Sequence, residues 1–177
     1  MKILHAGTKY VYLAGPILGC TLGEANDWRK FVSDELASFN IIGISPLRCE
    51  PLIGKTYSAE YPDPKFGTPR AIAAKNIFDV CDCDVTLAFM PKPPEGRTQS
   101  YGTIIECAWA KAYSKQVILC TNDPVVAAHP VLDACVSWKL ATKDCRDGTE
   151  ATIEDCLKAA VAICEGVLGG YTGGKNV

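Results

Sequence analysis

The stretch that decides the fold is residues 84–120, which read DVTLAFMPKPPEGRTQSYGTIIECAWAKAYSKQVILC. Its first part, residues 84–90, is a nearly continuous apolar run that predicts a buried strand, and residues 91–99 form a polar, proline-containing loop. Residues 103–113 have helical character, and residues 116–120 form a second apolar run. A strand, a helix and a strand in this order predict a right-handed crossover between two parallel strands.

The same alternation of strands and helices continues on both sides of this unit. Further strands are predicted over residues 10–14, 41–45 and, as a short edge strand, 136–140; helices are predicted over residues 24–39, 70–81 and from Thr149 or Thr152 to Leu168. In the first of these helices, charged residues such as Arg29 lie away from the apolar stripe. The pattern predicts an α/β fold with a parallel sheet and helices on both faces.

Three loops follow the carboxyl ends of the predicted strands, where open α/β sheets bind their ligands. They are residues 15–23, 45–69 and 91–102. Within the second, residues 46–69 are rich in proline and too long for an ordinary connection, so we predict an active-site loop. The tail, residues 171–177, is small and polar and is predicted to be mobile. A length of 177 residues favours a single domain over 1–177.

Composition excludes several function classes. The chain has 18 Lys and Arg against 20 Asp and Glu, a net charge of −2, so a nucleic acid polymer or an acidic membrane is not expected as the main partner. No signal peptide is apparent, and no run approaches the ~20 apolar residues of a membrane span. The ten cysteines are scattered without a C-x-x-C pair, which predicts buried reduced thiols, a cytoplasmic location and no metal.

Two interpretations of Glu106 remain open from the residues alone. Thr103 and Glu106 have the spacing of a helix capping box, in which both side chains bond free amides of the first turn. Alternatively, Glu106 is a carboxylate kept ionised by the helix N-terminus at the binding edge of the sheet. An ionised and positioned carboxylate is what a glycosyl-transfer nucleophile requires.

Other polar residues near the predicted strand ends also have two interpretations. Tyr12 is either a core aromatic or a hydroxyl placed to bond a carboxylate. Asp79 and Asp82 are expected to be solvated, and Asp84 could orient neighbouring loops. The loop over 15–19 matches neither a dinucleotide-binding nor a triphosphate-binding glycine motif.

Several sequence blocks together resemble the nucleoside 2-deoxyribosyltransferase family, which includes related nucleoside 5′-monophosphate N-glycosidases. The blocks are Tyr12-Leu13-Ala14-Gly15-Pro16-Ile17, then Lys75-Asn76 and Asp84-Val85, then Ser100-x-Gly102-Thr103-x-x-Glu106, then Lys115-x-Val117-Ile118. The resemblance implies a flavodoxin-like three-layer sandwich with a five-stranded parallel sheet. It also implies a homo-oligomer with sites near subunit contacts, and a reaction without metal or cofactor.

By position, the resemblance assigns roles to individual residues. Glu106 matches the family's nucleophile, and Tyr12 matches the tyrosine that holds it. Asn76 stands where many members have an aspartate that assists the departing base. The residues implied in substrate binding are Gly15, Pro16, Asp84, Ser100 and Gly102.

The implied function is cleavage of the N-glycosidic bond of a nucleoside or nucleotide through a covalent glycosyl-glutamate, with transfer of the deoxyribosyl group to another nucleobase. One alternative is hydrolysis of a nucleoside 5′-monophosphate, and another is an inactive nucleotide-binding module. Ser100 favours a phosphorylated substrate because a hydroxyl can donate to phosphate, whereas the loop over 17–23 has no Arg or Lys. Arg97 and Lys92 could supply that charge. Base, sugar, oligomeric state and transfer versus hydrolysis stay open.

Overall fold

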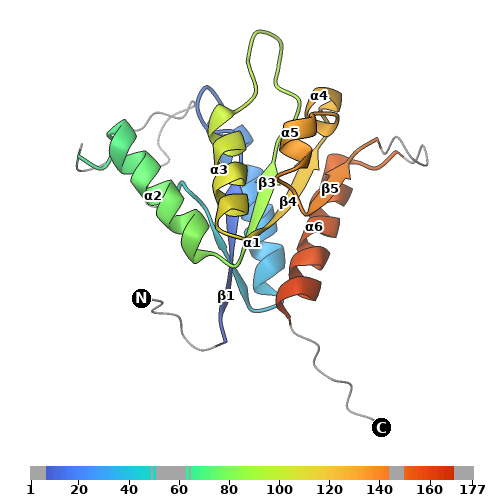
Figure 1. Cartoon of the computed structure of the whole chain (residues 1–177), viewed down its shortest axis with the longest axis horizontal. Coiled ribbons are helices and arrows are strands. Elements are labelled where there is room, and N and C mark those ends of the chain that lie inside the picture. Colours follow the sequence, from blue (N-terminus) through green and yellow to red (C-terminus); the bar gives the residue numbers. More distant parts are fainter. Residues whose placement is uncertain (1–6, 49, 51–62, 64, 144–149, 170–177) are drawn as a thin grey trace.

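The sheet is all parallel and has five strands in the described part of the chain. A computed structural model describes residues 7–48, 50, 63, 65–143 and 150–169 (Figure 1). The strands are β1 (Lys9–Ala14), β2 (Ile41–Ile44), β3 (Val85–Phe89), β4 (Gln116–Thr121) and β5 (Trp138–Ala141). Their order is β2-β1-β3-β4-β5, so β5 lies at an edge as predicted, although it begins two residues later than expected.

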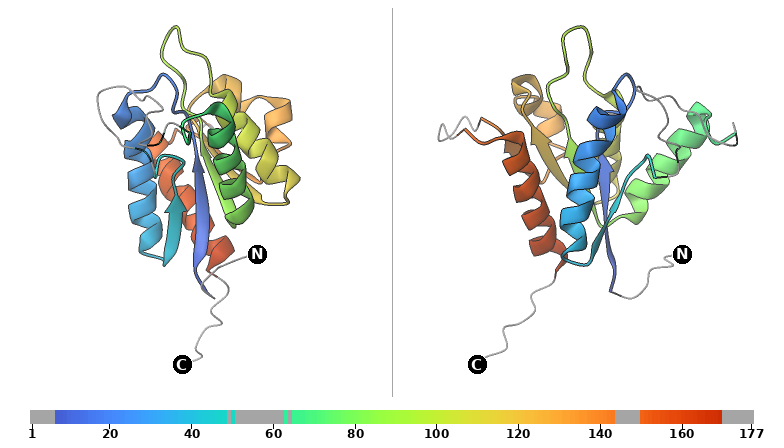
Figure 2. Two further views of the ribbon diagram at one scale, coloured as in Figure 1. Left: turned by 90° about the vertical axis from the view of Figure 1, so that its left-hand side faces the viewer. Right: turned by 180° about the vertical axis from the view of Figure 1, so that it is seen from behind.

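Helices cover both faces of this sheet. They are α1 (Leu22–Ala37), α2 (Pro69–Asp82), α3 (Tyr101–Ala112), α4 (Pro124–Ala127), α5 (Pro130–Asp133) and α6 (Ile153–Leu168). Helices α1 and α6 pack on one face, and α2, α3 and the two short helices pack on the other (Figures 1 and 2). The predicted flavodoxin-like three-layer arrangement is therefore confirmed. The short helices α4 and α5, each begun by a proline, were not predicted.

Side chains of β1 alternate between two hydrophobic cores. Val11 and Leu13 pack toward α1 and α6, in a cluster that includes Val32 and Leu157. Tyr12 and Ala14 pack toward α2 and α3 instead, in the cluster that contains Val80 and Cys107. Because successive strand residues point to opposite faces, the aromatic ring of Tyr12 is directed to the side of the sheet that carries α2 and α3.

Helix starts explain the small differences from the predicted bounds. Helix α1 begins at Leu22 because Thr21 and Glu24 form a capping box: the Thr21 hydroxyl accepts from the Glu24 amide, and the Glu24 carboxylate accepts from the Thr21 amide. Thr152 caps α6 in the same way with Asp155, so the second of the two predicted starts is correct.

The described cysteines are free thiols, and six of the eight are buried, as predicted; Cys49 and Cys145 lie outside the described residues. In the described ranges, no group of three or more His, Cys, Asp and Glu side chains is arranged to hold a metal ion. Among the helices of the same ranges, none has the length and apolar character needed to cross a membrane. Most of the predicted loop over 46–69 and all of the tail over 171–177 lie outside the described residues.

Candidate active site

A cavity of about 710 Å³ lies at the carboxyl ends of β1 and β3, where the strand order reverses. This is the position at which doubly wound sheets bind ligands. Two of the three predicted loops line it, with residues 15–18 after β1 and residues 91–94 and 97–103 after β3. The third loop contributes Pro46 and Glu50 among its described residues.

Of the two open interpretations of Thr103 and Glu106, the capping box is contradicted by the structure. Helix α3 begins two residues earlier than expected because Ser100 is the N-cap, and its hydroxyl oxygen accepts from the Thr103 amide at 3.3 Å. The Thr103 hydroxyl donates to the same Ser100 oxygen at 2.9 Å. Glu106 therefore lies in the second turn of α3, not in the first, and its carboxylate is not used to cap the helix.

Instead, the carboxylate of Glu106 is held by two donors from other elements. Its Oε1 accepts from the Tyr12 hydroxyl of β1 at 2.7 Å and from the Asn76 amide nitrogen of α2 at 2.9 Å. Its Oε2 has no hydrogen-bond partner within the described residues, while the side chain is 6% exposed and lines the cavity. One oxygen is thus fixed by the protein, and the other is available to a ligand.

Burial and charge act against each other on this carboxylate. Burial has the largest effect and raises the pKa of Glu106 to about 7. Four weaker effects lower this pKa: the hydrogen bonds from Tyr12 and Asn76 and the positive charges of Arg29 and Lys75. Burial, together with the neighbouring Glu106 carboxylate, raises the pKa of Tyr12 far above its usual value. Tyr12 therefore stays protonated and donates near neutral pH.

Arg29 is a buried cation beneath the loop that follows β1. Its guanidinium donates to the carbonyl oxygens of Leu13 at 3.1 Å and Gly15 at 2.8 Å, and also to that of Ala25. Burial lowers the pKa of Arg29 to about 10, so the group stays charged at neutral pH. Helical periodicity predicted Arg29 on the polar side of its helix and did not indicate this role. In the structure its charge favours the ionised form of Glu106.

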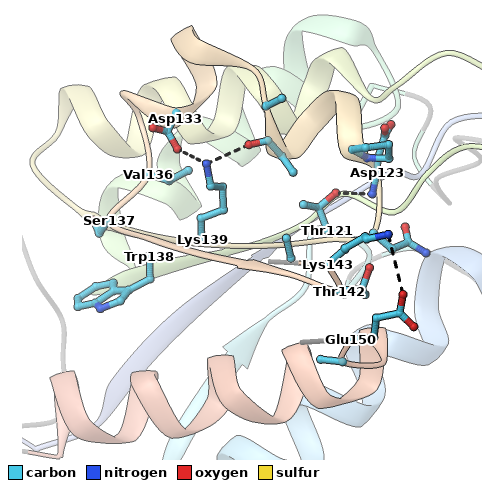
Figure 3. A pocket seen from close by; sticks show the side chains of 16 residues that line it. Thr121, Asp123, Asp133, Val136, Ser137, Trp138, Lys139, Thr142, Lys143 and Glu150 are labelled. Carbon is cyan, nitrogen blue, oxygen red and sulfur yellow. Dashed lines mark hydrogen bonds and ion pairs between the residues drawn. The ribbon is translucent and has the colours of Figure 1, made fainter. Parts of the chain in front are cut away.

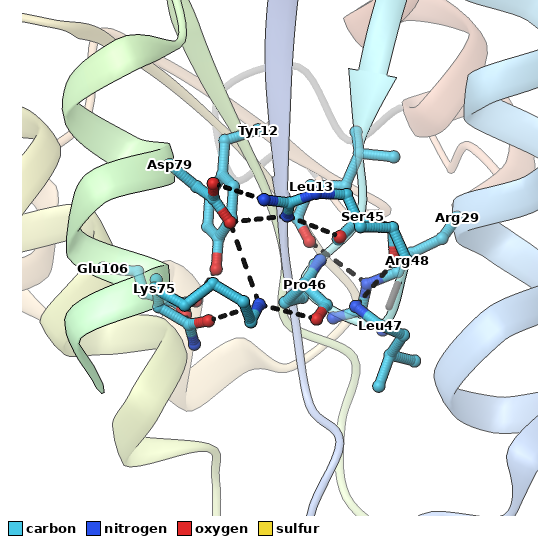
Figure 4. Close-up of polar contacts among 11 residues, drawn as sticks. Tyr12, Leu13, Arg29, Ser45, Pro46, Leu47, Arg48, Lys75, Asp79 and Glu106 are labelled. Atoms are coloured by element: carbon cyan, nitrogen blue, oxygen red, sulfur yellow. Dashed lines mark hydrogen bonds and ion pairs between the residues drawn. The ribbon is translucent and has the colours of Figure 1, made fainter. Parts of the chain in front are cut away.

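A second group of charged side chains, Lys75, Asp79 and Arg48, is connected to Asn76 through Lys75. Asp79 was predicted to be solvated, but it is 4% exposed and its two oxygens accept from Arg48 at 2.6 and 2.7 Å (Figure 4). Lys75 Nζ lies 3.8 Å from Asp79 and donates to Asn76 Oδ1 at 3.0 Å and to the Pro46 carbonyl oxygen at 2.7 Å. The i, i+4 spacing of Lys75 and Asp79 was the available signal for this pair.

The residues considered for phosphate binding belong to the same cavity. Ser100, Lys92 and Arg97 line it, as do Gly15, Pro16 and Gly102. Arg97 is already engaged: it donates to the Gly19 carbonyl oxygen at 2.6 Å and to the Glu24 carboxylate at 2.8 Å. Hydrogen bonding from Arg97 lowers the pKa of Glu24 to about 2. Arg97 therefore connects the loop after β3 to the loop after β1 and to the first turn of α1.

Two predicted site residues, Tyr12 and Asp84, do not line the cavity, and only Tyr12 is bonded to a residue that does, Glu106. Asp84 lies away from the site. It directly precedes β3, at the amino end of the strand, and its carboxylate accepts from the Tyr10 amide at 3.0 Å. The cavity lies at the carboxyl end of the same sheet. Asp84 therefore fixes the start of β3 against β1, and we do not propose it as a substrate-binding residue.

A second cavity of about 870 Å³ lies beside the edge strand β5 and the short helices α4 and α5 (Figure 3). Four of its charged side chains form two pairs: Lys139 donates to Asp133 at 2.6 Å, and Lys143 lies 4.0 Å from Glu150. None of the residues predicted to carry the chemistry lines it. Glu106 and the other candidate residues instead mark the first cavity as the candidate active site.

Comparisons with known proteins bear on the fold. No protein-family model matches the chain, and no curated protein matches it in sequence. A CMP N-glycosidase from Clostridium botulinum is similar in structure, with a TM-score of 0.54 and 19% identity over 88% of this chain and 99% of that one. A 2-deoxyribosyltransferase from Bacillus psychrosaccharolyticus has a TM-score of 0.54 and 14% identity, covering 83% and 95%. A conserved protein from Enterococcus faecalis has a TM-score of 0.50 and 17% identity, covering 85% and 96%. The chain therefore shares its fold with structures of a deoxyribosyltransferase and an N-glycosidase.

Proposed function

We propose that the protein cleaves the N-glycosidic bond of a nucleoside or nucleotide, with Glu106 as nucleophile, and transfers the deoxyribosyl group to another nucleobase. One observation carries the proposal. The buried carboxylate of Glu106 lines the cavity and has one oxygen bonded to Tyr12 and Asn76, while the other has no partner in the described residues. Such a carboxylate can approach an anomeric carbon without losing its position.

The reaction is a double displacement at C1′ of the sugar. Glu106 Oε2 attacks C1′, the bond between C1′ and the base nitrogen breaks, and its electron pair leaves with the base. Positive charge that develops on the sugar is stabilised by the carboxylate. The departing base takes a proton from water, since the Asn76 amide has no acidic proton to give. A nitrogen of the incoming base then attacks C1′ and loses its proton to water, and the ester bond breaks to restore Glu106.

A second candidate is hydrolysis of a nucleoside 5′-monophosphate, with water as the acceptor. The Ser100 hydroxyl, Lys92 and Arg97 line the cavity and could contact a phosphate. The CMP N-glycosidase of similar fold is consistent with such a substrate. Against this candidate, Arg97 is paired with Glu24, so a phosphate would have to compete with a carboxylate for the guanidinium. An inactive nucleotide-binding module is the third candidate, since Asn76 carries an amide in place of an acid.

Product analysis separates the three candidates. The protein is incubated with deoxynucleosides and with their 5′-monophosphates, each with and without an added acceptor base, and the products are resolved by chromatography. Transfer predicts a new nucleoside that requires the acceptor, whereas hydrolysis predicts free base and a sugar or sugar phosphate without it. Glu106→Gln, which keeps the shape of the side chain, should abolish both activities. Ligand binding without any release of base would support the inactive module and refute the proposal.

Three further expectations accompany this proposal. The resemblance predicts a homo-oligomer with sites near the subunit contacts, which light scattering of the purified protein would test. A single domain over residues 1–177 predicts one cooperative unfolding transition. A reaction without metal or cofactor predicts that exhaustive treatment with a chelator leaves the activity unchanged.

A further inference from the structure

The Asn76 amide is engaged at both ends. Its nitrogen donates to Glu106 Oε1 at 2.9 Å, and its oxygen accepts from Lys75 Nζ at 3.0 Å. A lysine ammonium can only donate, so the atom that faces Lys75 has to be the amide oxygen. This contact settles which way the amide is turned and directs its nitrogen to the carboxylate.

We propose that Lys75 is a positioning residue for the nucleophile, acting through Asn76, and that Asp79 and Arg48 hold the Lys75 ammonium in place. The proposal rests on the function proposed above for Glu106. Without the ammonium, the amide can rotate and present its oxygen to the carboxylate, which replaces an attraction with a repulsion. Lys75 itself does not contact the reacting atoms, so its effect passes through the orientation of Asn76.

The contacts around Lys75 explain why a flexible side chain can serve this purpose. Besides Asn76, its ammonium contacts the Pro46 carbonyl oxygen at 2.7 Å and lies 3.8 Å from the Asp79 carboxylate. The carbonyl oxygen belongs to the loop after β2 and the carboxylate to the next turn of α2, and the Lys75 side chain is 21% exposed. Among the described residues, two hydrogen-bond acceptors and a nearby carboxylate restrict a side chain that can otherwise adopt many conformations.

Asp79 is in turn fixed by Arg48. The guanidinium bonds both carboxylate oxygens, at 2.6 and 2.7 Å, a paired geometry that restricts rotation of the carboxylate. Arg48 also donates to the Ser45 carbonyl oxygen at 3.2 Å, which ties this group to the loop after β2. A chain of contacts therefore runs from that loop through Asp79, Lys75 and Asn76 to the nucleophile.

The charged and titratable groups that act on Glu106 come from three elements. They are Tyr12 on β1, Arg29 on α1 and Lys75 on α2. Loss of the Lys75 charge alone would raise the pKa of Glu106 through the loss of its attraction. Loss of the Asn76 orientation would raise the pKa of Glu106 further. A test must separate these two effects.

The test compares Lys75→Met, which removes the ammonium, with Lys75→Arg, which keeps a charged donor. Lys111→Met is the control, because Lys111 is an exposed lysine near the end of the helix that carries Glu106.

The Glu106 carboxyl is titrated by carbon-13 NMR in the ligand-free protein, and its signal is identified by its loss in Glu106→Gln. In parallel, kcat is measured for a substrate whose base the wild type releases. Lys75→Met should raise the Glu106 pKa and lower kcat by about tenfold, the loss expected for a hydrogen bond to a charged group. Lys75→Arg should recover most of kcat, and Lys111→Met should change neither quantity.

A double-mutant cycle then separates orientation from charge. In an Asn76→Ala background the amide is absent, so Lys75→Met should lower kcat little further and should raise the Glu106 pKa by less than it does in the wild type. Effects that simply add would overturn the proposal, as would a Lys75→Met variant that loses only thermal stability. If Lys75→Met does not fold, Lys75→Gln takes its place in the cycle. If the wild type releases no base from any substrate, the proposed function fails, and the NMR titration still decides whether Lys75 positions Asn76.

Discussion

Replacing Tyr12 with phenylalanine tests the electrostatics of the site most directly. The Tyr12 hydroxyl makes the shorter of the two contacts to Glu106, at 2.7 Å against 2.9 Å for Asn76. The ring is fully buried, so a phenylalanine can keep the same packing while the donor is lost. A hydrogen bond to a charged group contributes about 1.5–3 kcal/mol, and a pKa unit corresponds to about 1.36 kcal/mol. The pKa of Glu106, about 7 in the wild type, should therefore rise by roughly one to two units.

The assay is the pH dependence of kcat/KM, followed by release of free base. Only the ionised carboxylate can attack, so the activity of the wild type should rise with pH through about 7. In Tyr12→Phe this rise should move to higher pH by roughly one to two units, which lowers kcat/KM at pH 7 by about tenfold or more. At alkaline pH the variant should approach the wild type, because Asn76 still holds the carboxylate.

Tyr10→Phe is the matched control for this experiment. Tyr10 lies on the same strand and packs against the same core, and its hydroxyl makes no hydrogen bond among the described residues. Its removal should leave the pH profile unchanged. A Tyr12→Phe profile that does not move, or that moves to lower pH, would refute the view that the hydroxyl stabilises the ionised carboxylate.

Three further predictions follow from the same geometry. Glu106→Gln should be more stable than the wild type above about pH 7, because the folded pKa of about 7 lies above the ordinary glutamate value of about 4.5 and ionisation then costs the wild type about 3 kcal/mol. The difference should shrink as the pH falls and vanish below about 4.5; denaturant titrations at several pH values would measure it, and equal stability at alkaline pH would contradict it. Glu24→Gln keeps the helix cap but removes the carboxylate that pairs with Arg97. KM should therefore fall for a nucleoside 5′-monophosphate and stay constant for the nucleoside. If Arg97 does not bind phosphate, kinetics with both substrates would show an unchanged ratio of the two KM values. Gly15→Ala should destabilise the fold by about 1–3 kcal/mol, since the added carbon would lie 2.5 Å from the Trp28 ring; an unchanged melting temperature would contradict this.

Local patterns in the sequence predicted the elements that carry the site but not every contact within it. The apolar runs of β1 and β3 identified two parallel strands, and the blocks around Tyr12 and Glu106 marked their carboxyl ends. The start of α3 was misplaced because Ser100 and Thr103 are both good N-caps and lie three residues apart. The structure shows that Ser100 is the N-cap, and that the Glu106 carboxylate bonds the Tyr12 hydroxyl and not an amide of the first turn.

Buried charges were harder to predict for a different reason. Arg29 and Asp79 lie on helices among other charged residues, where most such side chains are solvated. Their burial depends on partners that are distant in sequence: the carbonyl oxygens after β1 for Arg29, and Arg48 for Asp79. Helical periodicity describes one element at a time, so it cannot report a contact between a helix and a loop that precedes it.

The properties of Glu106 follow from where the strand order reverses. The connections that follow β1 and β3 leave the sheet in opposite directions, through α1 on one face and through α3, with α2 packed beside it, on the other. Tyr12, Arg29 and Asn76 reach Glu106 or its surroundings from three different elements for this reason. Their combined effect opposes burial and leaves a carboxylate with a pKa of about 7, which is more basic than an exposed glutamate yet still ionises near neutral pH. A more basic carboxylate is a better nucleophile once ionised, and the same ionisation weakens the fold. The raised pKa of Glu106 therefore lowers the stability of the fold at alkaline pH while it increases the reactivity of the carboxylate. The Glu106→Gln variant measures the effect on stability, and the Tyr12→Phe variant measures the effect on activity.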